Sequence, residues 1–438
     1  MTFPRASFGW PALLLLLAVL QLPLALNPGY FSHDELQWAA RADVSTWSAL
    51  PWESWTDFGV FQYRPLTFNL WLLLSYALFA TPMGMHAVFA GLGLLNAMLL
   101  GRAVQAAGAP RRAAMAAAAV FTLLPYAVYV HGWVGTLADL LVLLAVLFGV
   151  RLLQRNAAGP PFLVTGLLLA LLTCAALLSK ESAIVLPAAL LPALHRHPHP
   201  RRALALVAVA GLPVVAYLAL RLPVILSTPA GSESYAWSIG HVPARLAEYL
   251  AYPFLPPLFE VGSTLSKSPA RLLLAAACLA ALLGALASAG WRWSGAWIAL
   301  VVALLAPVLV LPASYAQYAY LAGAAAVGLA AVAWPHLNRA PRIALGIATA
   351  VAVAHGATVM ARMHRIGVVQ HRFHTDLSAL VAQTREAPRI ALADENDRWM
   401  AARFLREVPS YRGARLAEPG EPAPFLMRRD GRIVRTTP

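Results

Sequence analysis

The chain has 438 residues, of which 60% are hydrophobic and only 12% are charged. Ordinary globular domains carry about 25% charged residues, and about 20 consecutive apolar residues are needed to cross a bilayer as a helix. This composition excludes a soluble enzyme, a secreted disulfide scaffold and a disordered chain. The apolar runs are continuous, which also excludes a small transmembrane β-barrel, so we expect an all-α polytopic membrane protein.

Taken in chain order, the apolar runs predict about eleven transmembrane helices. The first run, Trp10 to Leu26, has no small-x-small cleavage site after it, so we interpret it as a retained helix and not as a signal peptide. Cys174 and Cys278 each fall inside an apolar run, where a free thiol behaves as a small hydrophobic group. The other predicted spans are residues 84–102, 112–130, 134–152, 161–178, 183–195, 203–221, 270–289, 294–311, 317–333 and 342–360.

Three segments between or after the spans are too long to be simple connectors. The first outer loop, 27–83, contains an amphipathic stretch, Leu66 to Ala80, that we expect to lie flat on the membrane as a juxtamembrane helix. The second long outer loop is 222–269. Residues 361–438 are rich in arginine and acids, and a strand-like PRIALA followed by a helical DENDRWMAARFLREV predicts a small soluble α/β domain. The chain thus divides into a transmembrane domain, 1–360, and this C-terminal domain.

The placement of charge predicts the orientation of these spans. If successive loops alternate between the two sides of the membrane, the loops on one side contain twelve cations and the short loops on the other contain five. The positive-inside rule then predicts a cytoplasmic N-terminus and an extracytoplasmic C-terminus. The membrane we expect is a bacterial inner (plasma) membrane. All ten carboxylates before residue 361 fall on the outer side or at outer helix ends. Charge near a membrane is costly and usually functional, which makes the outer face the predicted working face. The net charge of +14 comes from an excess of arginine, which is as typical of the codon bias of a GC-rich genome as of a binding surface. We therefore expect no nucleic-acid partner.

An acidic pair, Asp34 and Glu35, follows the first span. A carboxylate that stays ionised beside the membrane can act as a general base toward an incoming hydroxyl. Capping of a helix that begins near Leu36 explains the pair equally well, because acidic side chains favour helix N-termini.

A cation flanked by an aromatic residue, Tyr63-Arg64, precedes the juxtamembrane stretch. A guanidinium binds phosphate oxygens through two parallel hydrogen bonds, and a position at headgroup depth suits a lipid phosphate. An interfacial arginine that extends its charge into water is the alternative.

Charged residues also open the fourth span and close the fifth. Asp139 follows His131 and lies about 7 Å below the mouth of its span, where an acid needs a cation or a wet cavity. The spacing of His131 and Asp139 does not favour a metal site. Lys180, in a chain that otherwise uses arginine almost everywhere, stands beside Glu181; the two either serve a site or simply pair to cap two helices.

A polar and aromatic motif, SYAQYAY, lies between the ninth and tenth spans and contains Tyr315, Gln317 and Tyr318. Its phenol and amide groups are able to bind a sugar or a phosphate oxygen. An aromatic belt at the membrane surface explains the motif nearly as well.

In this order the motifs resemble the GT-C class of polytopic glycosyltransferases, and most of all the relatives of the protein O-mannosyltransferases, including transmembrane TPR-type O-mannosyltransferases and bacterial counterparts. The most specific pieces are YRPLT and LLSKESA, and the likeness covers about residues 8–335. Two features depart from that pattern. Gln317 stands where the late motif commonly has an arginine, and the C-terminal domain replaces the TPR array.

The resemblance implies a GT-C-like bundle that transfers a sugar, with inversion, from a polyprenyl-phosphate-linked donor to a hydroxyl of a protein, lipid or polysaccharide at the extracytoplasmic face. Asp34 would be the base, with Glu35 beside it. No metal and no cofactor are expected. The expected phosphate-binding residues are Arg64, Lys180, His131, Tyr315, Gln317 and Tyr318, and the expected supporting residues are Tyr63, Asp139 and Glu181.

Two other functions remain open from the sequence. A polymerase or ligase of lipid-linked glycans would share the donor and attack with a glycan hydroxyl. A transporter or flippase of lipid-linked sugars would line a path with its intramembrane charges, but here the charges gather at one face, not at the midplane, and the chain shows no inverted repeat.

Overall fold

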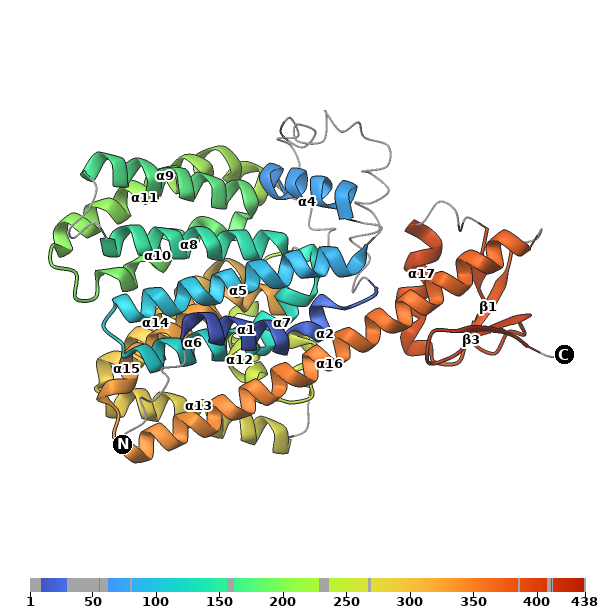
Figure 1. Ribbon diagram of the computed structural model, residues 1–438. Helices are drawn as coiled ribbons and strands as arrows, with labels where there is room; N and C mark the ends of the chain where they lie inside the picture. Colours follow the sequence, from blue (N-terminus) through green and yellow to red (C-terminus); the bar gives the residue numbers. More distant parts are fainter. Residues whose placement is uncertain are drawn as a thin grey trace, which may run out of the picture.

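The computed structural model describes residues 9–29, 55, 62–78, 81–155, 161–227, 236–266, 269–384, 387–407, 411 and 413–436. Most of these residues form a bundle of helices, and the longest helix extends beyond the bundle to a small sheet (Figure 1). Apolar runs fold as helices because backbone groups in lipid must bond within their own segment. The helices are α1 (Trp10–Leu20), α2 (Leu22–Ala25), α4 (Pro65–Leu78), α5 (Pro82–Ala106), α6 (Arg111–Leu123), α7 (Pro125–Gly132), α8 (Leu137–Arg155), α9 (Phe162–Ser179), α10 (Leu186–Leu190), α11 (Pro200–Leu226), α12 (Val242–Ala251), α13 (Pro269–Ser288), α14 (Trp291–Leu309), α15 (Tyr320–Ala333), α16 (Arg339–Gln383) and α17 (Arg398–Glu407).

Eight helical segments among the described residues are long and apolar enough to cross a membrane, or nine if α6 and α7 form one bent span. The chain is therefore a helical polytopic membrane protein, as predicted. The count of eleven stays a prediction, because two of the expected spans are short. The first is interrupted at Gln21, which leaves α1 with 11 residues, or about 16 Å of helix. The sixth consists of η2 (Glu181–Val185), α10 and η3 (Leu191–Leu194).

The bend between α6 and α7 measures 61° and has a chemical cause. Proline lacks a backbone N–H and its ring clashes with the carbonyl four residues earlier, so α6 ends at Leu123 and α7 begins at Pro125. The carbonyl of Thr122, in the last turn of α6, accepts a hydrogen bond of 3.3 Å from the side chain of Gln21. Gln21 is itself the residue at which α1 is interrupted, so this hydrogen bond joins the two breaks.

Helix α4 corresponds to the predicted juxtamembrane stretch and buries its polar side chains. Thr67, Asn69 and Ser75 are all buried, whereas Tyr76 is exposed. The hydroxyl of Thr67 donates to the carbonyl of Ser179 at 2.9 Å, which ties α4 to the end of α9. A helix that turns polar groups inward and apolar groups outward suits a lipid environment. The inclination of α4 to the membrane stays a prediction.

Helix α16 has 45 residues, equivalent to about 67 Å. The predicted domain boundary after residue 360 therefore falls inside a continuous helix and not in a linker. We call the end of the bundle from which α16 emerges the sheet end (Figure 1). We call the opposite end the arginine end, because α6, α11 and α16 begin there and have Arg111, Arg201 and Arg339 in their first turns.

The chain leaving α2 is fixed against α16 near the sheet end. The side chain of Asn27 donates to the carbonyl of Met363 at 3.2 Å, and a ring nitrogen of His364 lies 2.8 Å from the carbonyl of Pro23. A Cβ added at Gly367 would lie 1.6 Å from the side-chain oxygen of Asn27, so only glycine permits this approach.

Beyond α16 lies a four-stranded sheet of β1 (Arg389–Leu392), β2 (Arg415–Leu416), β3 (Phe425–Met427) and β4 (Ile433–Arg435), in the order β2-β1-β3-β4. β1 is parallel to β2 and β3, and β4 is antiparallel to β3. PRIALA forms β1, and the predicted helical segment contains α17. Phe373 and Leu377 of α16 join the core of this unit, so the same helix is part of both cores.

We expect Gly356→Ala in α16 to lower the free energy of unfolding by about 1–3 kcal/mol, the usual cost of overpacking. A Cβ at this position would lie 1.8 Å from the carbonyl oxygen of Leu123, in the last turn of α6. Thermal unfolding in detergent, followed by tryptophan fluorescence, measures the effect. Gly346→Ala in the same helix is the control, because its Cβ meets nothing within 4 Å and alanine favours helix by about 0.5–1 kcal/mol. Equal melting temperatures for the two variants would contradict the close packing of α16 on α6.

Candidate active site

The predicted catalytic pair, Asp34 and Glu35, lies outside the described residues. The predicted phosphate-binding and supporting residues are all described. Four of them, Arg64, Asp139, Lys180 and Glu181, form two adjoining ion pairs. The four residues lie just before α4, in the first turn of α8, just after α9 and in η2, and form what we call the outer ion-pair cluster, after the predicted outer face.

The first pair joins Lys180, at the end of α9, to Asp139, in the first turn of α8. The ammonium nitrogen of Lys180 lies 2.5 Å from Oδ1 of Asp139, and the two side chains are only 5% and 10% exposed. Asp139 thus has the cation that its depth requires. The expected alternative, a pair of Lys180 with its neighbour Glu181, does not form.

Glu181 instead pairs with Arg64, which precedes α4. Nε of Arg64 donates to both carboxylate oxygens, at 3.0 and 2.8 Å, and Nη2 lies 2.7 Å from Oε2. Both side chains are 19% exposed, so this pair is wetter than the first. Such a bidentate contact between a guanidinium and a carboxylate holds the guanidinium plane in one orientation.

The SYAQYAY motif reaches the cluster through one aromatic ring. The ammonium of Lys180 lies 4.9 Å from the ring centre of Tyr318, a cation–π distance. The backbone N–H of Tyr315 donates to the hydroxyl of Tyr249 at 3.3 Å, which leaves the Tyr315 ring exposed. The side-chain oxygen of Gln317 is buried and has no hydrogen-bond partner within the described part of the chain.

His131 is not part of the cluster, contrary to the prediction that it binds phosphate. It is fully buried in α7, with Nδ1 2.8 Å from the side-chain nitrogen of Gln21 and Nε2 2.9 Å from the hydroxyl of Tyr320. Asn96 also donates to Tyr320 at 3.4 Å. Because both ring nitrogens are occupied by side chains of the bundle, His131 joins α2, α7 and α15 and has no access to a ligand.

Arg221, near the end of α11, was not among the residues predicted for the site. Its side chain is buried, and its guanidinium lies 5.3 Å from the ring centre of Tyr63, the residue next to Arg64. Burial raises the pKa of the Tyr63 phenol, and the charge of Arg221 opposes that shift. The protonated phenol donates to the carbonyl of Trp55 at 3.2 Å. A cation at the last turn of a predicted span was the signal that should have identified Arg221.

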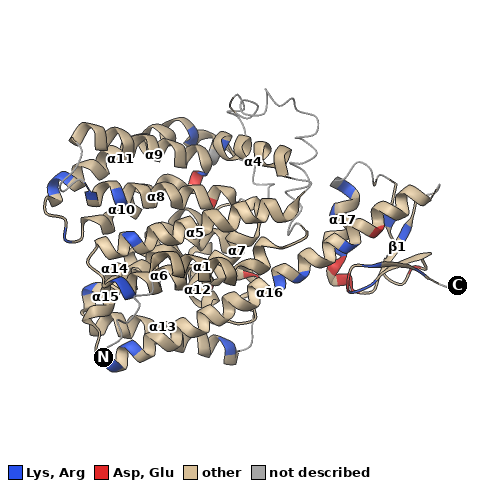
Figure 2. Ribbon diagram, in the orientation of Figure 1, with Lys and Arg blue, Asp and Glu red and all other residues tan. Residues whose placement is uncertain are grey.

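Charge is distributed unequally between the two ends of the bundle. Figure 2 shows the acidic segments of the bundle in the half nearer the sheet, where the cluster lies, and basic segments in both halves, including the arginine end. Cations held by carboxylates in a partly dry site can bind an anionic group and stabilise negative charge that develops on it.

No group of three or more His, Cys, Asp or Glu side chains is placed to hold a metal ion within the described ranges. No family model, curated protein or solved structure matches the chain. The function has to be argued from the residues and their geometry.

We expect Lys180→Met alone or Asp139→Leu alone to cost about 3–5 kcal/mol of stability, since either leaves an uncompensated buried charge, whereas the double variant should unfold close to wild type. Thermal unfolding of the wild type, the two single variants and the double variant in one detergent gives the coupling free energy between Lys180 and Asp139. The control is Arg398→Gln, which breaks a more exposed pair with Glu395 and should cost at most about 1 kcal/mol. Single variants no less stable than this control would show that the pair is not desolvated.

Proposed function

We propose that the chain is a membrane glycosyltransferase that moves a sugar from a polyprenyl-phosphate-linked donor to an acceptor hydroxyl at the extracytoplasmic face. The observation that supports it best is the outer ion-pair cluster, in which Arg64 and Lys180 adjoin at the acidic half of the bundle. The resemblance of the YRPLT and LLSKESA motifs points the same way, because these motifs supply the two cations.

In this proposal the cations bind the phosphate of the donor. When the bond between the anomeric carbon and the phosphate oxygen breaks, negative charge grows on the leaving polyprenyl phosphate, and Arg64 and Lys180 stabilise it. Glu181 and Asp139 keep the two cations in place, so little reorganisation is needed during the reaction. Tyr318 contributes its ring to the Lys180 side of the site.

The base in this proposal is Asp34, with Glu35 beside it. Asp34 accepts the proton of the acceptor hydroxyl while that oxygen attacks the anomeric carbon from the face opposite the phosphate, which inverts the configuration. The contact of Asn27 with Met363 supports this role, because it fixes the chain at the sheet end seven residues before Asp34. His131 is left out of the mechanism, since the bundle occupies both of its ring nitrogens.

The direct test is to incubate the purified chain, in detergent and in liposomes, with labelled polyprenyl-phosphate sugars and a set of acceptors. Label transferred singly to a protein, lipid or polysaccharide acceptor supports transfer. Ladders of growing glycan would assign the chain to the polymerases and ligases of lipid-linked glycans. Unchanged lipid that crosses the liposome membrane would assign it to the flippases and overturn the proposal.

We expect Arg64→Gln to raise the KM for the donor by about 10- to 100-fold, the cost of losing a hydrogen bond to a charged group, and to leave the KM for the acceptor nearly unchanged. Arg398→Gln is a matched control, because Arg398 also forms an ion pair, with Glu395 at 2.5 Å, at the start of α17 outside the bundle. Initial rates at varied donor and acceptor concentrations separate the two constants. A larger effect on the acceptor would place Arg64 on the acceptor side.

We expect Asp34→Asn to lower kcat by about 10²- to 10⁴-fold, as for loss of a general base, and to leave donor binding and detergent stability intact. Donor binding is measured by filter retention of the labelled lipid. Full activity in this variant removes Asp34 from the mechanism. Glu35→Gln, measured in parallel, shows whether the neighbour carries the role instead.

A further inference from the structure

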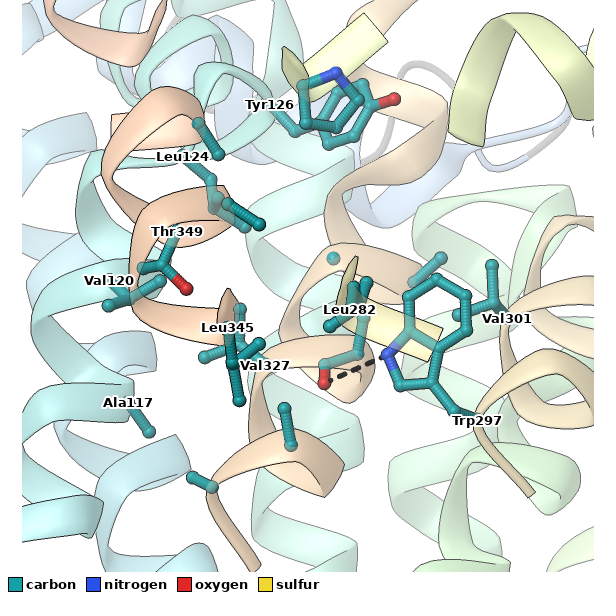
Figure 3. A pocket seen from close by; sticks show the side chains of 18 of the residues that line it. Ala117, Val120, Leu124, Tyr126, Leu282, Trp297, Val301, Val327, Leu345 and Thr349 are labelled. Carbon is teal, nitrogen blue, oxygen red and sulfur yellow. Dashed lines mark hydrogen bonds between the residues drawn. The ribbon is translucent and has the colours of Figure 1, made fainter. Parts of the chain in front are cut away.

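A cavity of about 480 Å³ lies inside the bundle, among α6, α13, α14, α15 and α16. Figure 3 shows Val120, Leu282 and Val327 directed toward its interior, together with Trp297, whose indole N–H donates to the carbonyl of Ala326 at 3.3 Å. The walls are therefore mostly hydrocarbon. A volume of this size is in the range of pockets that hold one small ligand or one segment of a larger one.

The cavity is long and follows the axis of the bundle. Its lining includes residues of α15 and its flanks from Ala319 to Trp334, which is about 22 Å of helix. The hydrocarbon core of a bilayer is about 30 Å thick. Ala322, Gly323 and Ala330 line this wall, and such small side chains leave room beside the helix. The shape is that of a single extended chain.

The cavity and the outer ion-pair cluster are held by different helices. The outer ion-pair cluster is held by α4, α8, α9 and η2, and none of these elements contributes a residue to the cavity lining. At the sheet end the cavity is lined by Tyr126, Tyr249 and other uncharged residues. The cavity comes near the cluster at the SYAQYAY motif, because Ala319, the neighbour of Tyr318, is part of the lining.

The charge at the cavity lies at the opposite end. Arg112, in the first turn of α6, is the one charged residue among the described residues of the lining. Arg342, in the first turn of α16, lies with its guanidinium 5.7 Å from the ring centre of Trp334, another lining residue. Arg111, next to Arg112, lines a second hollow of about 340 Å³ together with Arg102.

These arginines lack acidic partners within the described ranges. Asp139, Glu181 and Glu248 pair with other cations, and Figure 2 shows the acidic segments of the bundle in the half nearer the sheet. The guanidinium of Arg112 also stands at a helix N-terminus, where the helix dipole adds positive potential. The positive potential at the arginine end of the cavity therefore favours binding of an anion from outside the protein.

We propose that the cavity binds one acyl chain of an anionic phospholipid whose headgroup phosphate lies at Arg112 and Arg342. A phospholipid has a hydrocarbon chain linked to an anionic headgroup, and the cavity has an apolar lining that ends at arginine. Basic pockets between membrane helices are known to bind such headgroups. By the positive-inside rule this lipid belongs to the cytoplasmic leaflet. The site is additional to the proposed donor site and does not depend on the chemistry proposed there.

The test is native mass spectrometry of the detergent-purified chain after incubation with phosphatidylglycerol, phosphatidylethanolamine or polyprenyl phosphate at equal concentrations. We expect one tightly retained phosphatidylglycerol and weaker retention of phosphatidylethanolamine. Polyprenyl phosphate should bind without displacing it. Complete displacement of the phospholipid by polyprenyl phosphate would show that the cavity belongs to the donor and would overturn the proposal.

Two variants locate the bound lipid. Ala322→Leu with Ala330→Leu fills the cavity and should reduce retention at least tenfold, whereas Ala277→Leu with Ala280→Leu, at exposed positions of α13, should not. Arg112→Gln should reduce the preference for phosphatidylglycerol by about fivefold, because one cation near a membrane surface contributes about that factor. Arg292→Gln, exposed and outside the cavity, is its control. Equal effects of each variant and its control would show nonspecific annular lipid and refute the site.

Discussion

A charged group that enters the edge of a membrane must find an opposite charge, because water is no longer there to solvate it. This constraint organises the half of the bundle nearer the sheet. Asp139 would be too costly alone, and its contact with Lys180 requires the end of α9 to lie beside the start of α8. Arg64 and Glu181 repeat the arrangement between the start of α4 and η2. The ion pairs thus fix the relative positions of elements that are far apart in the sequence.

The same constraint acts on uncharged polar groups deeper in the bundle. Gln21, His131, Tyr320 and Asn96 form a continuous set of hydrogen bonds that joins α2, α5, α7 and α15. Each of these side chains is almost completely buried. The histidine of this network is committed to folding and not to ligand binding, because both of its ring nitrogens are engaged by side chains of the bundle.

Much of the fold could be predicted from the sequence, since long apolar runs leave few alternatives to helix in lipid. Asp139 also had to have a cation nearby, but the sequence could not say which one, because ion pairs depend on helix packing and not on chain proximity. For that reason the sequence left a pair between the neighbours Lys180 and Glu181 open, whereas each of them pairs with a residue distant in the chain. His131 was misassigned because its partners, Gln21 and Tyr320, come from distant helices. The domain boundary was predicted where hydropathy falls, after residue 360, whereas the helical hydrogen bonding of α16 continues through this point to Gln383.

That unbroken helix determines how the small sheet is oriented. A flexible linker would let the sheet turn freely, whereas an α-helix of fixed pitch converts each residue into a defined rotation of about 100° and an advance of about 1.5 Å. Phe373, packed in the core beneath the sheet, follows Met363, packed against the bundle, by ten residues of such helix. Adding one residue there would rotate the whole sheet by more than a quarter of a circle about the helix axis. The number of residues in this part of α16 therefore determines which face of the sheet is turned toward the bundle.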